Sequence, residues 1–104
     1  MNQMFNKDEF IKRNSEFLYQ RLNNFLEIEV NEETFLIIYK FLELQNFRNG
    51  EYEGNQYLIH KKNIQEVQIV DMVSEEFCND FSQTRFDITV YELLDLMNEM
   101  KDAR

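Results

Sequence analysis

Apolar residues repeat at helical spacing near the start of the chain. Between Lys7 and Leu26 they recur every three or four residues, as on one face of an amphipathic helix. Asn6 followed by Glu9 has the side-chain pattern of a capping box, with Asn in place of the usual Ser or Thr. The pattern therefore predicts a first helix over 7–26.

The end of the chain has the clearest helix start. Thr89 and Glu92 have the spacing of a capping box, and Ile88 with Leu93 can form a hydrophobic staple across it. A C-terminal amphipathic helix is therefore predicted. Its apolar stripe consists of Val90, Leu93, Leu94, Met97 and Met100.

Alternating apolar and polar residues in the middle of the chain predict strands. Residues 56–60 and 64–70 are two strand-like runs joined by the polar residues 61–63. An earlier strand near Tyr52, turning at Gly54 and Asn55, would give the pair a third partner. Two isolated strands are only marginally stable, so we expect helices or a third strand against them.

Two further segments are predicted as helices. Asn31 is a suitable N-cap for a helix over Glu32 to Gln45, although the run 35–39 is β-prone and Asn49-Gly50 is a hairpin signal. We favour the helix and leave the strand as the alternative. Ser74 is expected to open a short helix that ends near Phe81.

These elements predict an α+β fold in one compact domain over residues 1–104. An N-terminal helix or helical hairpin, a small antiparallel sheet, a short helix and a C-terminal helix follow one another. No linker or internal repeat divides the chain. A chain of 104 residues with ten Phe and five Tyr can bury a core of its own.

Several features indicate a soluble cytoplasmic protein. Cys78 is the only cysteine, so no disulfide can form within the chain. Residues 1–12 carry charges and lack the apolar centre of a signal peptide. The longest wholly apolar run, residues 35–39, is far shorter than the roughly 20 residues that span a bilayer.

The charge of the chain is strongly negative and unevenly distributed. The formal net charge is −9. Residues 1–62 have ten acids and eight bases, whereas residues 63–104 have ten acids and three bases. Such a field repels nucleic acids and anionic lipids and attracts basic surfaces. We therefore expect neither direct nucleic-acid binding nor membrane binding.

The sequence offers no recognisable catalytic group. Its single histidine, His60, and single cysteine, Cys78, lie in different predicted elements. Glu76 and Asp80 are four residues apart, but the spacing of the acids matches no calcium loop. We expect a protein that is not an enzyme and that has no cofactor and no metal site.

Basic residues cluster only as Lys12-Arg13 and Lys61-Lys62. A winged-helix arrangement would put Lys61 and Lys62 at the tip of a wing. The overall charge argues against that arrangement.

What remains is recognition of another protein. Acids after Asn63 are expected to form a negative surface interleaved with Phe77, Phe81, Phe86 and Tyr91. An alternative assigns the aromatics to the core and the acids to solubility. The predicted partner-binding acids are Glu66, Asp71, Glu75, Glu76, Asp80, Asp87, Glu92 and Asp95.

The leading hypothesis is a small acidic inhibitor that occupies a basic surface of a partner. That partner would be a nuclease or another nucleic-acid-binding complex, and the acids would mimic a phosphate backbone. A phage or mobile-element anti-defence protein (anti-CRISPR-like) and a toxin immunity protein would both match this small size and negative charge. The alternative is a homo-oligomeric structural or regulatory module, with a homodimer formed through Leu96 of the last helix.

If the acids bind a partner, charge reversals at Glu75, Glu76 and Asp80 should weaken binding more than reversals at Asp8 and Glu9. Equal losses at both sets would reduce the acidity to a solubility trait.

Overall fold

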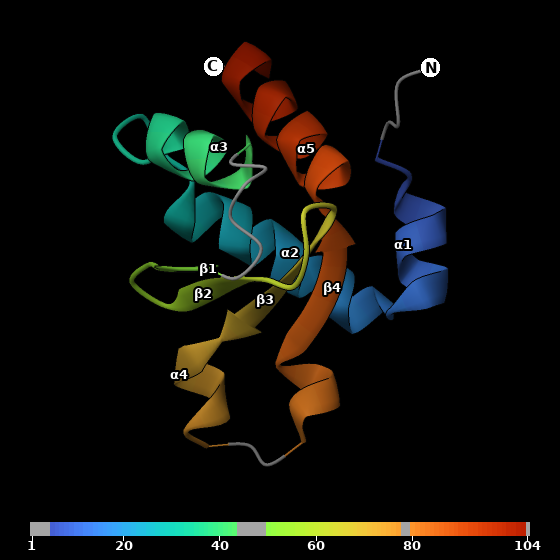
Figure 1. Ribbon diagram of the computed structural model, residues 1–104. Coiled ribbons are helices and arrows are strands. Elements are labelled where there is room, and N and C mark those ends of the chain that lie inside the picture. Colours follow the sequence, from blue (N-terminus) through green and yellow to red (C-terminus); the bar gives the residue numbers. More distant parts are fainter. Residues whose placement is uncertain (1–4, 44–49, 78–79, 104) are drawn as a thin grey trace.

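The computed structural model describes residues 5–43, 50–77 and 80–103. Within these residues, four strands form one antiparallel sheet in the order β1-β2-β3-β4, with helices before, between and after them (Figure 1). The predicted α+β class is confirmed. In chain order the elements are α1 Lys7–Arg13, α2 Glu16–Glu29, α3 Phe35–Glu43, β1 Gly50–Glu53, β2 Tyr57–Lys61, β3 Glu66–Asp71, α4 Met72–Glu75, the 3₁₀ helix η1 Phe81–Gln83, β4 Arg85–Thr89 and α5 Val90–Ala103.

The predicted first helix is two helices. Ser15 Oγ accepts the backbone N–H of Leu18 at 3.0 Å and so caps α2. The Asn14 side chain donates to the carbonyl of Phe10 at 3.3 Å, where α1 ends. Short polar side chains compete with helical hydrogen bonds in this way, and two of them stand side by side here. The prediction of one continuous helix over 7–26 is therefore wrong.

The preference for helix over strand in 32–45 is confirmed over Phe35–Glu43, whereas residues 32–34 form a turn that leads into α3. Asn31 Oδ1 accepts the backbone N–H groups of Glu33 and Thr34 at 2.9 and 3.1 Å. The β-prone run forms a helix because Ile38 and Leu42, four residues apart, both reach the core. Residues 44 and 45 of the predicted range lie outside the described residues, as does Asn49 of the hairpin signal.

Three of the strands agree with the prediction and one was missed. β1 lies near Tyr52 as expected, and β2 and β3 overlap the predicted runs 56–60 and 64–70 but each ends one residue later, so Lys61 belongs to β2 and not to the connection. β4 was not predicted, although its residues alternate between half-buried and buried. Its short period-two pattern runs directly into the cap of α5. That cap is confirmed, because Thr89 Oγ1 accepts the N–H of Glu92 and a Glu92 carboxylate oxygen accepts the N–H of Thr89.

The predicted short helix from Ser74 to Phe81 is wrong at both ends. α4 begins at Met72, because Asp71 rather than Ser74 is its N-cap. Phe81 opens the separate helix η1. Residues 78 and 79, which include Cys78, lie outside the described residues.

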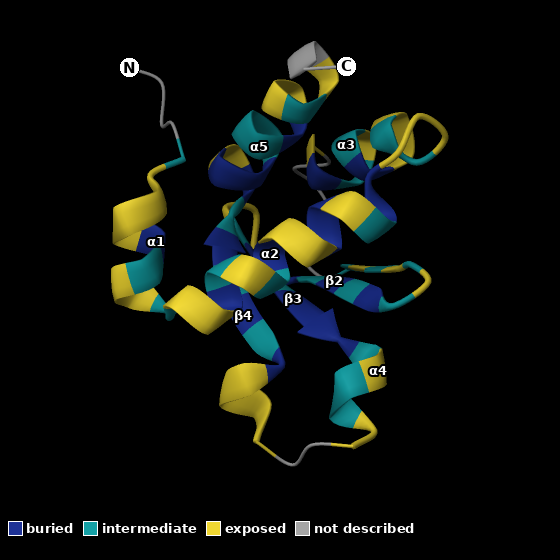
Figure 2. Cartoon of the chain, turned by 180° about the vertical axis from the view of Figure 1, so that it is seen from behind, coloured by how far each residue is buried: buried dark blue, intermediate teal, exposed yellow. Residues whose placement is uncertain are grey.

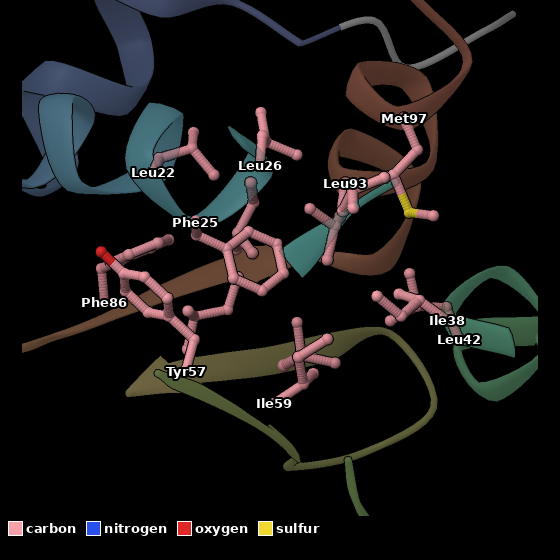
Figure 3. Close-up of a cluster of buried hydrophobic side chains, with 14 of the residues drawn as sticks. Leu22, Phe25, Leu26, Ile38, Leu42, Tyr57, Ile59, Phe86, Leu93 and Met97 are labelled. Atoms are coloured by element: carbon pink, nitrogen blue, oxygen red, sulfur yellow. The ribbon is translucent and has the colours of Figure 1, made fainter. Parts of the chain in front are cut away.

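The core lies on one face of the sheet. Tyr52, Ile59, Ile69 and Phe86 are neighbours across the four strands. Helices α2, α3 and α5 cover this row (Figures 1 and 3). The helix residues that Figure 3 labels over the sheet are Leu22, Phe25, Leu26, Ile38, Leu42, Leu93 and Met97, all of them buried.

The other face of the sheet carries a polar row. Glu51, His60, Gln68 and Asp87 are neighbours across the strands. His60 Nδ1 lies 3.2 Å from a Glu51 oxygen, and Lys62 Nζ lies 3.0 Å from Asp87 Oδ2. The alternation of the strands thus puts most apolar strand residues on the core face and most polar ones on the other, with Lys61 on the core face and Leu58 and Val70 on the other among the exceptions.

A buried carboxylate joins helix α2 to the hairpin of β1 and β2. Glu29 is only 3% exposed, and its oxygens accept the backbone N–H groups of Asn55, Gln56 and Tyr57 at 3.0, 2.7 and 2.7 Å. Gly54 lets it approach, since a Cβ at that position would lie 2.2 Å from Glu29 Oε1. These hydrogen bonds therefore hold the β1–β2 turn against the C-terminal end of α2.

Lys61 is also buried, with no exposed surface. Its Nζ donates to the carbonyls of Phe41 and Leu42, in the last turn of α3, at 3.3 and 3.4 Å. Burial lowers the pKa of Lys61. A winged-helix arrangement needed Lys61 and Lys62 on the surface, but Lys61 instead holds α3 to β2, an inner strand of the sheet.

A double-mutant cycle tests the joint between Glu29 and Gly54. Glu29→Ala should lower the free energy of unfolding by roughly 2–4 kcal/mol, because it leaves backbone donors without their acceptor. Gly54→Ala should cost about 1–3 kcal/mol on its own by overpacking. When Glu29 is already alanine, Gly54→Ala should lower the free energy of unfolding by less than about 0.5 kcal/mol, because the new Cβ no longer meets the carboxylate. Urea unfolding measures all four proteins.

Glu27→Ala is the matched control on an exposed position of the same helix, and it should change stability by no more than about 0.5 kcal/mol. Strictly additive costs of the Glu29 and Gly54 substitutions would show that the carboxylate and the turn do not depend on each other.

Candidate interaction surface

A lobe projects from one end of the sheet, where β3 and β4 are connected. We call its described residues, 72–77 and 80–84, the tip. It consists of α4, η1 and the adjoining turns, and it hangs below the sheet in Figures 1 and 2. Helices α3 and α5 lie at the opposite end of the molecule in both views, whereas α2 crosses the sheet between them and the tip.

The tip carries exposed apolar side chains. Phe77 is 84% exposed, Phe81 51% and Val73 47%. A single exposed apolar residue is ordinary, but three of them in one short lobe are unusual for a free surface. The exposed acids Glu76 and Asp80 stand among them, and Figure 2 shows η1 as exposed. Aromatics and acids thus occur together, as the sequence predicted for this segment.

Asp71 anchors the first half of the tip. The residue is 1% exposed, and its Oδ1 accepts the backbone N–H of Ser74 at 3.0 Å as the cap of α4. Its Oδ2 accepts from the Ser74 hydroxyl at 2.9 Å and from the Gln56 side chain at 3.1 Å. Arg21 of α2 forms an ion pair with the same carboxylate. All of these contacts fix α4 against the sheet and α2.

Glu75 and Arg85 anchor the second half. Arg85 Nη2 donates to Glu75 Oε1 at 2.9 Å, and its Nε donates to Oε2 at 2.5 Å. The hydroxyl of buried Thr84 adds a bond to Oε2 at 2.9 Å. Hydrogen bonds from Arg85 hold the pKa of Glu75 below its usual value. The guanidinium carbon of Arg85 lies 4.2 Å from the centre of the Phe81 ring. This cation–π contact holds an exposed aromatic side chain against the Glu75–Arg85 pair.

An open groove runs beside the tip. Its volume is about 510 Å³. Phe81 and Arg85 border it on one side, and Arg13 and Asn14, at the corner between α1 and α2, border it on the other. A partner that covered Phe81 would therefore find a recess next to it.

Beside α4 and α2 lies a smaller pocket of about 270 Å³. Arg21, Gln56 and Tyr57 are among its lining residues. The Tyr57 hydroxyl donates to Asn24 Oδ1 at 2.5 Å. Burial, and next the charge of Asp71, raise the pKa of Tyr57 to about 12. The polar groups of this pocket are used mainly to hold one another and α4.

The structure divides the eight predicted partner-binding acids into two groups. Four are in ion pairs within the chain: Asp71 with Arg21, Glu75 with Arg85, Asp87 with Lys62, and Glu92 with Arg13. Of the others, Glu66 begins β3 and Glu76 is on the tip. Asp80 caps η1 by accepting from the backbone N–H and the hydroxyl of Ser82, and Asp95 of α5 accepts the N–H of Phe5 at 3.0 Å.

Two of the predicted contacts lie in the core instead. Asp71 is almost inaccessible, and Phe86, expected among the surface aromatics, is 3% exposed. Glu75 is tied to Arg85, so its reversal would break an anchor and is no clean probe of partner binding. Tyr91 is exposed but lies in the first turn of α5, at the far end of β4 from the tip. Only Glu76 and Asp80 combine exposure with a position beside Phe77 and Phe81.

Sequence reasoning missed the anchors themselves. Arg21, Thr84 and Arg85 were not selected, although Arg85 is the only base between residues 64 and 100. A single base in so acidic a segment is a usable signal, because several acids compete for it. Arg21 gave no such signal, since its partner Asp71 is 50 residues away in the sequence.

The described residues contain no group of three His, Cys, Asp or Glu side chains that could hold a metal ion. Within the same ranges, no helix is long and apolar enough to cross a membrane. His60 lies on the charged face of the sheet beside Glu51. The described surface has one projecting lobe with exposed aromatic residues.

The raised pKa of Tyr57 predicts a loss of stability at high pH. The unfolded chain releases the tyrosine proton near pH 10, whereas the folded chain holds it until about pH 12. Deprotonation therefore stabilises the unfolded state first, and the folded state becomes less stable relative to it as the pH rises through this window. Between pH 9 and pH 11 the protein should lose about 1 kcal/mol more than Tyr57→Phe does.

Urea unfolding at several pH values measures this difference. Tyr91→Phe, at a position that is 56% exposed, is the control and should keep the slope of the unaltered protein. A Tyr57→Phe protein with that same slope would show that the hydroxyl is not held in its protonated form.

No family model matches this sequence, and neither a curated protein nor a solved structure matches it. The function is therefore argued from the chain's own geometry. The feature that calls for an explanation is the tip, where exposed aromatic residues are held by buried and half-buried ion pairs.

Proposed function

We propose that this protein is a small acidic inhibitor that uses its tip to bind a basic surface of a partner protein. The surface would be one that handles nucleic acid, in a nuclease or another nucleic-acid-binding complex. The proposed protein is not an enzyme, and it acts by occupying that surface. The observation that carries the proposal is Phe77, which is 84% exposed on an anchored lobe.

Burying Phe77 in a partner is strongly favourable. Full burial of such a side chain is worth roughly 1.5–3 kcal/mol. A few aromatic anchors of this kind usually supply most of the energy of an interface. Phe81 is half-exposed beside the open groove and would extend the contact.

The anchors reduce the entropic cost of binding. A loose loop must be ordered when it binds, at about 0.5–1.5 kcal/mol for each immobilised side chain. Here Asp71 caps α4, and the Glu75–Arg85 pair holds the other side of the lobe. We therefore expect the described residues of the tip to be ordered before they meet a partner.

Electrostatics support a basic partner. The net charge of −9 repels phosphate backbones and attracts the surfaces that bind them. Four cations are neutralised by acids of the chain itself, while Glu76 and Asp80 are exposed at the tip. These two carboxylates would lie where a bound nucleic acid has its phosphates.

A phage or mobile-element anti-defence protein (anti-CRISPR-like) and a toxin immunity protein both fit this mechanism. Each would be made in the cytoplasm beside its target, and each must be small, specific and able to compete with nucleic acid. The two differ in the partner and share the chemistry of the contact.

The test of the aromatic contact begins with a photo-crosslinking amino acid at position 77, used in cells of the native host to identify the partner. With that partner purified, Phe77→Ala should weaken binding by about tenfold to a hundredfold. Tyr91→Ala, an exposed aromatic at the other end of β4, is the matched control and should bind normally. Equal losses from both substitutions would refute the tip as the contact.

Charge reversal tests the basic target. Glu76→Lys should slow association several-fold, and the effect should fade as salt is raised, because exposed charges act mainly on the on-rate. Asp8→Lys makes the same change in net charge on α1 and should have a much smaller effect. Nucleic acid added to the partner should compete with the unaltered protein. Binding that resists both salt and nucleic acid would end the proposal of a nucleic-acid-binding target.

A further inference from the structure

Helix α3 has an apolar surface on its outer side as well as on its inner side. Ile38 and Leu42 are buried in the core, whereas Leu36 and Ile37 are 57% and 56% exposed. In an ordinary surface helix the outer positions are polar. Two large aliphatic residues that are adjacent and more than half exposed therefore indicate that this side of α3 is covered by something else.

Oppositely charged residues flank the two aliphatic ones. Glu33 precedes them and Lys40 follows them, and both are exposed. Helical hydrogen bonds extend back over this stretch, because Phe35 N–H donates to the carbonyl of Asn31 at 2.8 Å. Seven residues are about two helical turns, so Glu33 and Lys40 lie on the same side as the aliphatic pair.

The arrangement is complementary to itself. Its midpoint lies between Leu36 and Ile37, with Glu33 and Lys40 each 3.5 residues away, or about 5 Å along the helix axis. If a second α3 packs antiparallel about a two-fold axis through that midpoint, Glu33 of one copy meets Lys40 of the other. Leu36 of each copy then meets Ile37 of its partner. A two-fold interface needs one patch that matches itself in this way.

We propose that the outer side of α3 is the interface of a homodimer formed by antiparallel pairing of α3 with a second copy. Two apolar contacts form its centre, and two Glu33–Lys40 pairs lie at its rim. So small a contact gives weak association, with a dissociation constant of roughly 10–100 µM.

The pairing leaves the tip free. α3 and the tip lie at opposite ends of the molecule in Figures 1 and 2, so a dimer would present one tip on each side. The expected homodimer through Leu96 finds no support, because Leu96 is partly buried against the core of its own chain. The outer side of α3 is the more suitable surface.

Sedimentation of the purified protein between about 1 µM and 1 mM tests the homodimer. The average mass should rise toward that of two chains over this range. Leu36→Ser should weaken the association at least tenfold, whereas Val73→Ser, at a similarly exposed position on the tip, should leave it unchanged. Both positions are exposed, so the variants should fold, and circular dichroism verifies this.

A charge exchange separates a second copy from any other partner. Glu33→Lys and Lys40→Glu should each weaken the dimer about tenfold, because each makes two repulsive pairs. The double exchange restores opposite charges at both ends of the interface and should restore the dimer. A protein that stays monomeric at 1 mM, or a double exchange no better than the single ones, would overturn the inference. Loss of binding to a different protein in a monomeric Leu36→Ser variant would assign α3 to that protein instead.

Discussion

The carboxylate of Glu29 accepts three backbone N–H groups, and the packing of the helices on the sheet depends on this contact. It joins the end of α2 to the β1–β2 turn, and so sets the helical layer against the sheet. Hydrogen bonds continue from there, because the N–H of Met72, the first residue of α4, donates to the carbonyl of Gln56 at 2.9 Å. The Gln56 side chain also reaches Asp71, the cap of α4. The position of the tip therefore depends, through Gln56, on the buried carboxylate of Glu29 at the end of α2.

The acidity of the chain has two roles that composition alone does not separate. Glu29 and Asp71 are buried and organise the backbone around them. Glu76 and Asp80 are exposed at the tip and are the acids proposed to meet a basic surface. A surface can therefore be negative for recognition while much of the negative charge is structural.

Local patterns in the sequence predicted much of the fold. The caps at Asn6, Asn31 and Thr89 involve residues three positions apart, so the sequence displays both partners together. The prediction of a single long helix over 7–26 was wrong because the apolar spacing continues through Asn14 and Ser15. The side chains of these two residues form local hydrogen bonds that interrupt the helix. β4 was missed because five residues leading into a helix cap give only a short alternating signal.

The candidate site was predictable in composition and not in geometry. Phe77 and Phe81 were expected near acids, and they are exposed there. Asp71 and Glu75 have the same chemistry as Glu76, and only the fold shows that Arg21 and Arg85 bind the first two. Such pairs join residues 50 and 10 positions apart, so their formation depends on tertiary packing that no local pattern encodes.

Amide hydrogen exchange of the free and partner-bound protein is the most direct measurement of the central claim, which is that a preformed tip makes the contact. In the free protein, the amides of Met72 and Ser74, which are hydrogen-bonded, should exchange slowly, since the anchors already order the lobe. On binding, added protection should concentrate in 72–77 and 80–84 and leave α5 unchanged. Fast exchange of those two amides in the free protein, or new protection centred on α5, would contradict the claim.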